Sequence, residues 1–208
     1  MVVNIIHDPL RTDRAALLQK EIEQENLEVE YWPAIKHSRP NIGIMQAHKR
    51  IVRWARLQKC KTVCIGEDDL WFTCAGAWKY FLENMPEDFD IYLASIYWGD
   101  IFDANKVRSF SGLTLYVVHE RFYDVFLSIP EGQHIDMGMK GKGKFIVCNP
   151  FAAIQHETRS DNTTKKLNNG RWLKNRRLFD GYDENGKAKS ISYEERNIIL
   201  REQEYRML

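Results

Sequence analysis

The chain has 208 residues, of which 44% are hydrophobic, 28% charged and 12% aromatic. This composition suits one α/β domain with a core of its own and excludes a wholly disordered chain. The formal net charge is +1, so no overall field predicts nucleic acid as a partner. Apolar stretches are far shorter than the roughly 20 residues of a membrane span, and the first residues lack a signal-peptide pattern. We therefore expect a soluble, cytoplasmic protein.

The four cysteines lie at positions 60, 64, 74 and 148 and form no Cys-x-x-Cys pair. Their spacing therefore does not predict a structural zinc site. Cys64 lies inside an apolar run and Cys148 follows another, so both are expected to be buried thiols.

The first third of the chain alternates between short β-branched runs and segments of helical periodicity. Such alternation is typical of βαβ units and a parallel or mixed sheet. The expected elements are a strand at 2–6, a helix that begins at 12 or 13, a strand at 28–32 that is closed by Pro33, a helix at 43–57 and a strand at 61–65.

The same alternation continues to about residue 150, after which the composition becomes polar. We expect a domain at 1–165 and an appendage at 166–208. Within them we predict helices at 75–82, near 122–126 and at 192–206, strands at 91–95, 113–118 and 145–148, a basic loop at 140–144, and turns at 168–170 and 183–186.

Three carboxylates, Glu67, Asp68 and Asp69, follow the strand at 61–65 directly. Adjacent ionised aspartates repel each other by a few kcal/mol at ~4 Å and an effective dielectric of ~20, so a cation is expected to stabilise them. Oxygen ligands suit Mg²⁺ or Mn²⁺, with substrate phosphates completing the shell. Open α/β sheets also bind ligands at the carboxyl ends of their strands. An acidic turn or a helix N-cap is the alternative interpretation.

Further motifs occur in a characteristic order along the chain. They are Arg11 and Arg14 after the first strand, Pro33-Ala34-Ile35, Gln46-Ala47-His48, the run from Val63 to Phe72, Gly112 to Tyr116 with Tyr123 and Phe126, His134-Ile135-Asp136, Pro150-Phe151 with Gln155, and Ser160-Asp161. Over roughly residues 1–165 the chain resembles glycosyltransferase family 25, the lipooligosaccharide and collagen galactosyltransferase group. Ala47-His48 stands where that family usually has a Ser-His pair.

The resemblance implies a GT-A-like, Rossmann-like mixed sheet with flanking helices and a polar C-terminal helical appendage. It also implies transfer of a hexose, galactose or glucose, from a UDP-sugar to a glycan or lipid-linked acceptor, with Mn²⁺ or Mg²⁺ and inversion at the anomeric carbon. Lipopolysaccharide biosynthesis is the expected setting. A catalytically silent nucleotide- or glycan-binding module is the alternative, and a metal-dependent phosphohydrolase ranks last.

The expected site combines residues from the whole domain. We assign Asp69 and His156 to the metal, and Arg11, Arg14, Glu67, Asp68 and Gln155 to the donor. Asp68 and Asp136 are assigned to catalysis, with Asp136 as the general base that takes the acceptor proton. For Asp136 a helix N-cap is an equal alternative, and His134 is a rival base. Surface or helix-start roles remain open for His156 and Arg11.

Two basic segments allow further contacts. The loop at 140–144 is a candidate lid over the donor phosphates, with a solvated loop as the alternative. Arg171, Trp172 and Lys174 begin an amphipathic patch that suits an anionic glycolipid or the inner face of a membrane, with a solvated helix face as the alternative. Trp98 is expected near the acceptor, where indole rings stack on sugars.

Overall fold

The computed structural model describes residues 1–103, 105–159 and 168–206. The first elements are β1 (Val3–His7), α1 (Thr12–Glu25) and β2 (Val29–Pro33). β1 and β2 pair in parallel with Val3 opposite Val29, which confirms the predicted βαβ unit. Helix α1 ends at Asn26, whose left-handed backbone (φ 51°) is the conformation that terminates many helices.

The remaining elements follow in the predicted alternation, with several short strands added. They are α2 (Pro40–Leu57), β3 (Thr62–Glu67), β4 (Leu70–Phe72), α3 (Ala77–Glu83), β5 (Ile91–Leu93), β6 (Ile101–Phe102), β7 (Lys106–Val107), β8 (Leu115–His119), a 3₁₀ turn (Glu120–Phe122), α4 (Tyr123–Ser128), α5 (Ile135–Gly138), β9 (Phe145–Val147), β10 (Ala153–Gln155), α6 (Asn169–Leu173), β11 (Arg177–Tyr182), β12 (Ala188–Ser192) and α7 (Tyr193–Arg206).

Eight strands form one mixed sheet in the order β2-β1-β3-β8-β5-β9-β7-β6. β1 is parallel to both β2 and β3, and β5 is parallel to β9. β8 lies between β3 and β5 and is antiparallel to both. The carboxyl ends of β1 and β3 consequently lie side by side, which places the residues that follow them next to each other.

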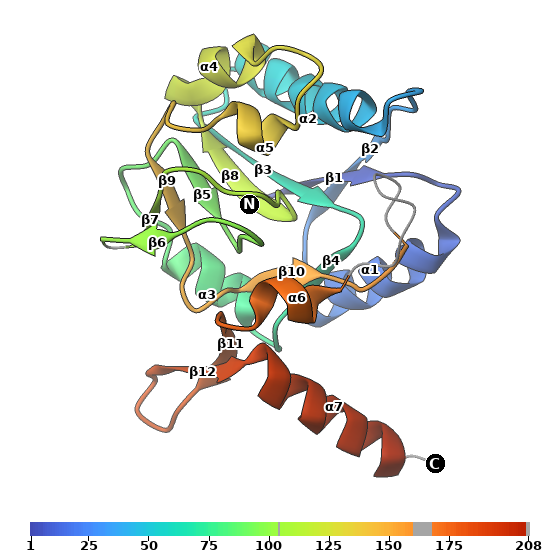
Figure 1. Ribbon diagram of the computed structural model, residues 1–208, viewed down its shortest axis with the longest axis vertical. Helices are drawn as coiled ribbons and strands as arrows, with labels where there is room; N and C mark the ends of the chain where they lie inside the picture. The colour runs from blue at the N-terminus through green and yellow to red at the C-terminus, as the bar shows by residue number, and fades with distance from the viewer. Residues whose placement is uncertain (104, 160–167, 207–208) are drawn as a thin grey trace.

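Helices cover both faces of this sheet, as Figure 1 shows, with α2, α4 and α5 on one face and α1 and α3 on the other. Alternate residues of β3 divide between the two cores. Val63 and Ile65 belong to the core beneath α2, and Cys64 belongs to the core that includes Leu18 of α1. This division follows from the two-residue period of a strand that is buried on both faces.

A separate two-stranded ribbon joins the acidic segment to the end of the domain. β4 and β10 pair antiparallel, with Trp71 opposite Ile154 and Leu70 opposite Gln155. Neither strand was predicted from the sequence, because each has only three residues and its partner lies about eighty positions away. The ribbon therefore depends on a tertiary contact.

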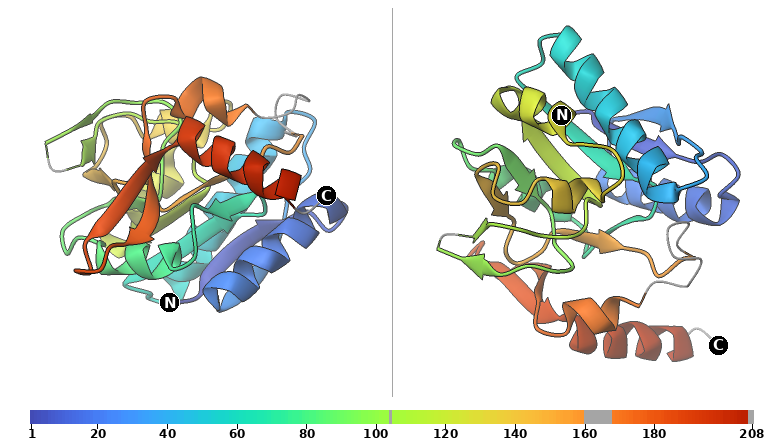
Figure 2. Two further views of the ribbon diagram at one scale, coloured as in Figure 1. Left: turned by 90° about the horizontal axis from the view of Figure 1, so that it is seen from below. Right: turned by 45° about the horizontal axis from the view of Figure 1, so that its top comes forward.

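The C-terminal segment packs on the domain through α6, the β11–β12 hairpin and α7, which lie together at one end of the molecule (Figure 2). Leu173, Leu178 and Phe179 are fully buried. The turn at 183–186 is the tip of the hairpin, as predicted. The turn predicted at 168–170 is instead the start of α6, because the Asn168 side chain accepts a hydrogen bond from the N–H of Arg171 (3.2 Å) and caps the helix.

Other expectations have mixed outcomes. All four cysteines are free, and Cys64 and Cys148 are buried as predicted. Across the described part of the chain, every helix is too short or too polar to cross a membrane. The predicted boundary between residues 165 and 166, and the Ser160-Asp161 motif, lie outside the described residues.

Candidate active site

The end of β3 distributes its three carboxylates in different directions. Glu67 continues the Val63–Ile65 face and points toward α2, because alternate strand residues share a face. Asp68 and Asp69 lie in the tight turn that leads into β4. Both aspartates are buried, with 5% and 4% of their surface exposed.

Asp68 turns toward the end of β1 and has partners on both oxygens. Its Oδ1 lies 2.7 Å from Nη1 of Arg14. Its Oδ2 accepts the backbone N–H of Asp8 at 3.1 Å and lies 3.2 Å from Nδ1 of His7. Asp68 therefore ties the end of β3 to the end of β1 and to α1.

Asp69 turns toward the ribbon. Its Oδ2 lies 3.0 Å from Nη2 of Arg14, and its Oδ1 accepts a hydrogen bond from Nε2 of Gln155 at 3.3 Å. Burial and the nearby Glu67 carboxylate raise the pKa of Asp69 to about 8, despite the opposing effect of Arg14. The pocket holds more negative charge than one guanidinium neutralises.

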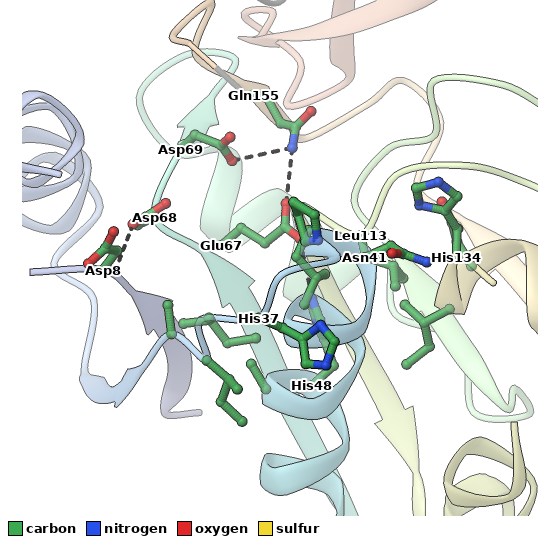
Figure 3. Close-up of a pocket in the computed structure, with 18 of the residues that line it drawn as sticks. Asp8, His37, Asn41, His48, Glu67, Asp68, Asp69, Leu113, His134 and Gln155 are labelled. Carbon is green, nitrogen blue, oxygen red and sulfur yellow. Dashed lines mark hydrogen bonds and ion pairs between the residues drawn. The ribbon is translucent and has the colours of Figure 1, made fainter. Parts of the chain in front are cut away.

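Glu67 is held on both of its carboxylate oxygens. Gln155 reaches from β10 and donates to Oε2 at 3.0 Å, and Nε2 of His48 lies 3.3 Å from Oε1. Figure 3 shows Gln155 between Glu67 and Asp69. The backbone N–H of Gln155 in turn donates to the hydroxyl of Tyr97 (2.6 Å). One amide thus fixes the relative positions of two pocket carboxylates.

The three carboxylates after β3, together with Arg14, His48 and Gln155, line a cavity of about 400 Å³ between the strand ends and the loops. Its acidic wall carries Asp8, Asp68 and Asp69, and His134 lies on the other side (Figure 3). The volume falls in the range of small-molecule sites. The remaining lining residues are Ile6, Arg14, Ala34, Ile35, Lys36, His37, Pro40, Asn41, Ile44, Ala47, His48, Glu67, Gly112, Leu113, Ile135, Asp136 and Gln155.

Asp136 lines the cavity at the start of α5. Its Oδ2 accepts the N–H of Gly112 at 3.0 Å and its Oδ1 accepts the N–H of Met137 at 2.8 Å. Asp136 is the second residue of α5, whose N-cap is His134, so the N-cap interpretation of Asp136 is wrong, and its place in the cavity agrees with the catalytic interpretation. Asp136 also fixes the Gly112 turn, where φ is +103°.

The structure brings six of the predicted site residues to the cavity and leaves two outside its lining. Arg14, Glu67, Asp68, Asp69, Asp136 and Gln155 line it. Arg11 forms a two-point ion pair with Asp13, at 2.9 and 2.8 Å. The ring of His156 stacks on Trp71, with ring centres 5.0 Å apart, and its Nε2 lies 3.5 Å from Glu21.

His156 nevertheless contacts the acidic turn through its backbone. Its N–H donates to the carbonyl of Asp69 at 2.7 Å. The predicted metal role of its imidazole stays a prediction, as does the donor role of Arg11.

Sequence reasoning missed several residues of the site. Asp8, whose carboxylate pairs with Lys36, directly follows β1 as Glu67–Asp69 follow β3. The same strand-end signal would have identified it. His48 was noted in the Gln46-Ala47-His48 motif but not assigned to the site, because it lies on the buried face of α2, where helical periodicity predicts core packing. Lys36, Asn41 and His37 lie in or near a loop that no local pattern distinguishes.

The carboxylates at the end of β3 offer oxygen ligands to a divalent cation. Within the described ranges, no group of three or more His, Cys, Asp or Glu side chains is arranged to hold an ion. Mg²⁺ and Mn²⁺ sites in phosphate-transfer proteins, however, often use only one or two carboxylates and complete the shell with substrate phosphates. Buried Asp69, with the unbalanced charge around it, fits that class of site.

Comparison of this geometry with solved structures identifies the fold. A mutant Drosophila galactosyltransferase 7, in complex with manganese, UDP-Gal and xylobiose, aligns over 92% of each chain with a TM-score of 0.50 and 8% identity. The fold is of the GT-A type found in that glycosyltransferase. At this identity the likeness concerns the fold alone.

Two further solved structures show lower structural similarity. A197 from STIV aligns over 74% of this chain and 84% of its own, with 12% identity and a TM-score of 0.48. A glycosyltransferase involved in the glycosylation of the major capsid of PBCV-1 aligns over 72% and 81%, with 12% identity and a TM-score of 0.43. A scan against protein-family models and a search of curated proteins give no match. Membership in family 25 stays a prediction.

Proposed function

We propose that this chain is an inverting glycosyltransferase that moves a hexose, galactose or glucose, from a UDP-sugar to a glycan or lipid-linked acceptor. The observation that carries the proposal is the cavity at the adjoining ends of β1 and β3, lined by Asp8, Glu67, Asp68 and Asp69. Ligands of open α/β sheets bind at this position. The GT-A fold, whose Drosophila example binds UDP-Gal, supports the same choice.

The donor is assigned to the acidic wall. Gln155 and Glu67 offer an amide and a carboxylate to sugar hydroxyls, and Asp68 acts with Arg14 at the junction of β1, β3 and α1. Arg14 is already paired with two aspartates, so its first role is to hold the acidic turn in place. Arg11 reaches the donor only if its pair with Asp13 opens.

We assign Asp69 to a divalent cation, Mn²⁺ or Mg²⁺. When bound, this ion neutralises the charge of the diphosphate as it leaves. Asp69 contributes an oxygen ligand, and Gln155 keeps its carboxylate in a fixed position beside Glu67. His156 supports this arrangement through its hydrogen bond to the Asp69 carbonyl.

Asp136 is assigned as the general base. It accepts the proton of the acceptor hydroxyl while that oxygen bonds to the anomeric carbon and the bond from this carbon to the diphosphate breaks. The two backbone hydrogen bonds to Asp136 fix its direction and leave further lone pairs for the acceptor. His134 also lines the cavity and is the rival base.

A glycolipid acceptor, as in lipopolysaccharide synthesis, agrees with the exposed surface of α6 and the residue that follows it. Trp172 is 42% exposed. The Arg171 guanidinium lies over its ring, with the central guanidinium carbon 4.9 Å from the ring centre. Lys174 is also exposed. Basic and aromatic side chains in this arrangement suit an anionic headgroup region, so we include peripheral contact with the inner face of a membrane.

One observation favours a second candidate, a catalytically silent nucleotide- or glycan-binding module. Arg14 already forms ion pairs with both Asp68 and Asp69 and supplies part of the positive charge that a metal would bring. A module of this kind binds the donor without a metal and does not turn it over.

The test is a thermal-shift and calorimetric titration with UDP-, GDP- and CMP-sugars, each with Mn²⁺ and with a chelator. Bound ligand raises the melting temperature by mass action. We expect stabilisation by UDP-sugars that requires Mn²⁺ and is lost in Asp69→Asn. Asp124→Asn is the matched control, because that side chain is 85% exposed and pairs only with Arg56 among the described residues.

Metal-independent binding without turnover would favour the binding module. No stabilisation by any nucleotide sugar would contradict the glycosyltransferase and leave a silent, glycan-binding module as the candidate.

A further inference from the structure

A chain of three polar side chains runs from the core into the cavity. The Tyr116 hydroxyl lies 2.7 Å from Nδ1 of His48, and Nε2 of His48 lies 3.3 Å from Oε1 of Glu67. Tyr116 is fully buried and His48 is 1% exposed, whereas the Glu67 side chain is 24% exposed. Of these three side chains, only Glu67 therefore presents a substantial surface to a ligand.

With a neutral imidazole and an ionised Glu67, one arrangement of protons satisfies both contacts of His48. Burial, and to a smaller extent Glu67, raises the pKa of Tyr116 well above its ordinary value, so its hydroxyl keeps its proton. That hydroxyl donates to Nδ1 of His48, its hydrogen-bond partner here. The imidazole then carries its proton on Nε2 and donates it to the Glu67 carboxylate.

Three different elements build the chain. Tyr116 pairs with Ile65 across β8 and β3, which places its ring on the same sheet face as Glu67. His48 comes down onto this face from α2. Tyr116 is held in turn by a stacked contact with Phe126, with ring centres 6.4 Å apart. The position of the imidazole is thus set by the sheet and two helices.

We infer that His48 is a positioning residue that directs Glu67 at the donor sugar, with its tautomer set by Tyr116. This inference rests on the proposed function. A glutamate has a flexible side chain, and Gln155 alone holds only one of its two oxygens. The donor from His48 holds the other and restricts the carboxylate to one orientation. Small displacements of a positioning group reduce turnover strongly.

The activity test compares variants by UDP release from the UDP-sugar that binds best. His48→Leu removes the donor to Glu67, and we expect turnover to fall about 10- to 100-fold, the range for loss of an orienting partner. His48→Gln keeps an amide N–H toward Glu67, and we expect it to recover most of this loss. Tyr116→Phe should fall between the two.

Tyr123→Phe is the matched control. It also removes a buried tyrosine hydroxyl, but that hydroxyl donates to the carbonyl of Cys60 (3.1 Å) and not to a cavity residue. We expect it to change turnover by less than about twofold. If His48→Leu and His48→Gln lose the same amount of activity, the inference is wrong. It is also wrong if neither variant loses activity and both bind the donor as tightly as the unmodified protein.

A second measurement does not depend on activity or on His48→Leu folding. Nitrogen-15 NMR of the unmodified protein reports which imidazole nitrogen carries the proton. We expect His48 to be protonated on Nε2 alone, and to lose this preference in Tyr116→Phe. A proton on Nδ1 in the unmodified protein would overturn the inference. Absence of any nucleotide-sugar binding would instead contradict the proposed function. The NMR measurement of the His48 tautomer would then be the test of the inference about His48.

Discussion

The guanidinium of Arg196 on α7 lies over the ring of Trp71 on β4, with its central carbon 4.1 Å from the ring centre. Nη2 of Arg196 also donates to the carbonyl of Phe72 at 3.2 Å. Trp71 follows Asp69 by two residues, and its ring also stacks with His156. The last helix is thus attached to the ribbon that carries the acidic turn and Gln155.

Replacing Arg196 is expected to affect both stability and donor binding. Arg196→Met removes a cation–π contact and a hydrogen bond, and should lower the free energy of unfolding by about 1–2 kcal/mol. UDP-sugar affinity should fall as the ribbon loosens. Urea unfolding and calorimetry measure the two effects. Lys174→Ala, an exposed change in the same segment, is the control, and equal effects of both variants would contradict the attachment.

The hairpin β11–β12 is expected to be part of the core. Phe179 is 0% exposed and stacks on Tyr80 with ring centres 4.0 Å apart. Phe179→Ala should therefore destabilise the whole protein by about 3–5 kcal/mol in a single unfolding transition. Ile198→Ala, at a position 58% exposed, should cost less than about 0.5 kcal/mol. A separate early transition for the C-terminal segment would show instead that it folds on its own.

Gly43 is expected to tolerate no side chain. An alanine Cβ there would lie 2.1 Å from the carbonyl oxygen of Ile35, which is backbone in the loop that lines the cavity. Replacing a glycine within a helix by alanine normally raises the free energy of unfolding by about 1 kcal/mol. Here we expect a net loss of about 1–3 kcal/mol from overpacking, together with weaker donor binding. Arg53→Ala on the exposed face of α2 is the control, and a stabilised Gly43→Ala variant would contradict the contact.

Asp69 is expected to make stability depend on pH. Its pKa is raised from 3.8 to about 8 in the folded protein, mainly by burial and then by Glu67. A raised pKa favours folding fully below about pH 4, and this contribution is lost as the pH rises through about 8. Asp69→Asn removes the titration, so the stability of the unmodified protein relative to this variant should decrease between about pH 4 and pH 8.

Urea unfolding in metal-free buffers across that range measures the difference. Asp124→Asn should retain the slope of the unmodified protein. Parallel profiles for the unmodified protein and Asp69→Asn would show that Asp69 has an ordinary pKa.

The sequence by itself determined the elements whose signals are local. The apolar run that ends before Glu67 predicts β3, and the helical spacing of apolar residues up to Leu57 predicts α2. Both periods repeat within a few residues, so a short stretch of sequence is enough to show them. The abrupt change from apolar residues to three carboxylates predicts a ligand site at the end of β3. Asp68 and Asp69 were expected in the site for this reason, and Gln155 from the family resemblance, and all three line the cavity.

Only the tertiary structure decided which distant residues meet that strand end. The order of strands in the sheet brings Asp8 beside Asp68, and the packing of α2 brings His48 to Glu67. The β4–β10 pairing and the contact of Arg196 with Trp71 join segments more than eighty residues apart. Such contacts form because folding removes apolar surface from water over the whole domain. No short stretch of sequence shows how much surface the complete fold buries.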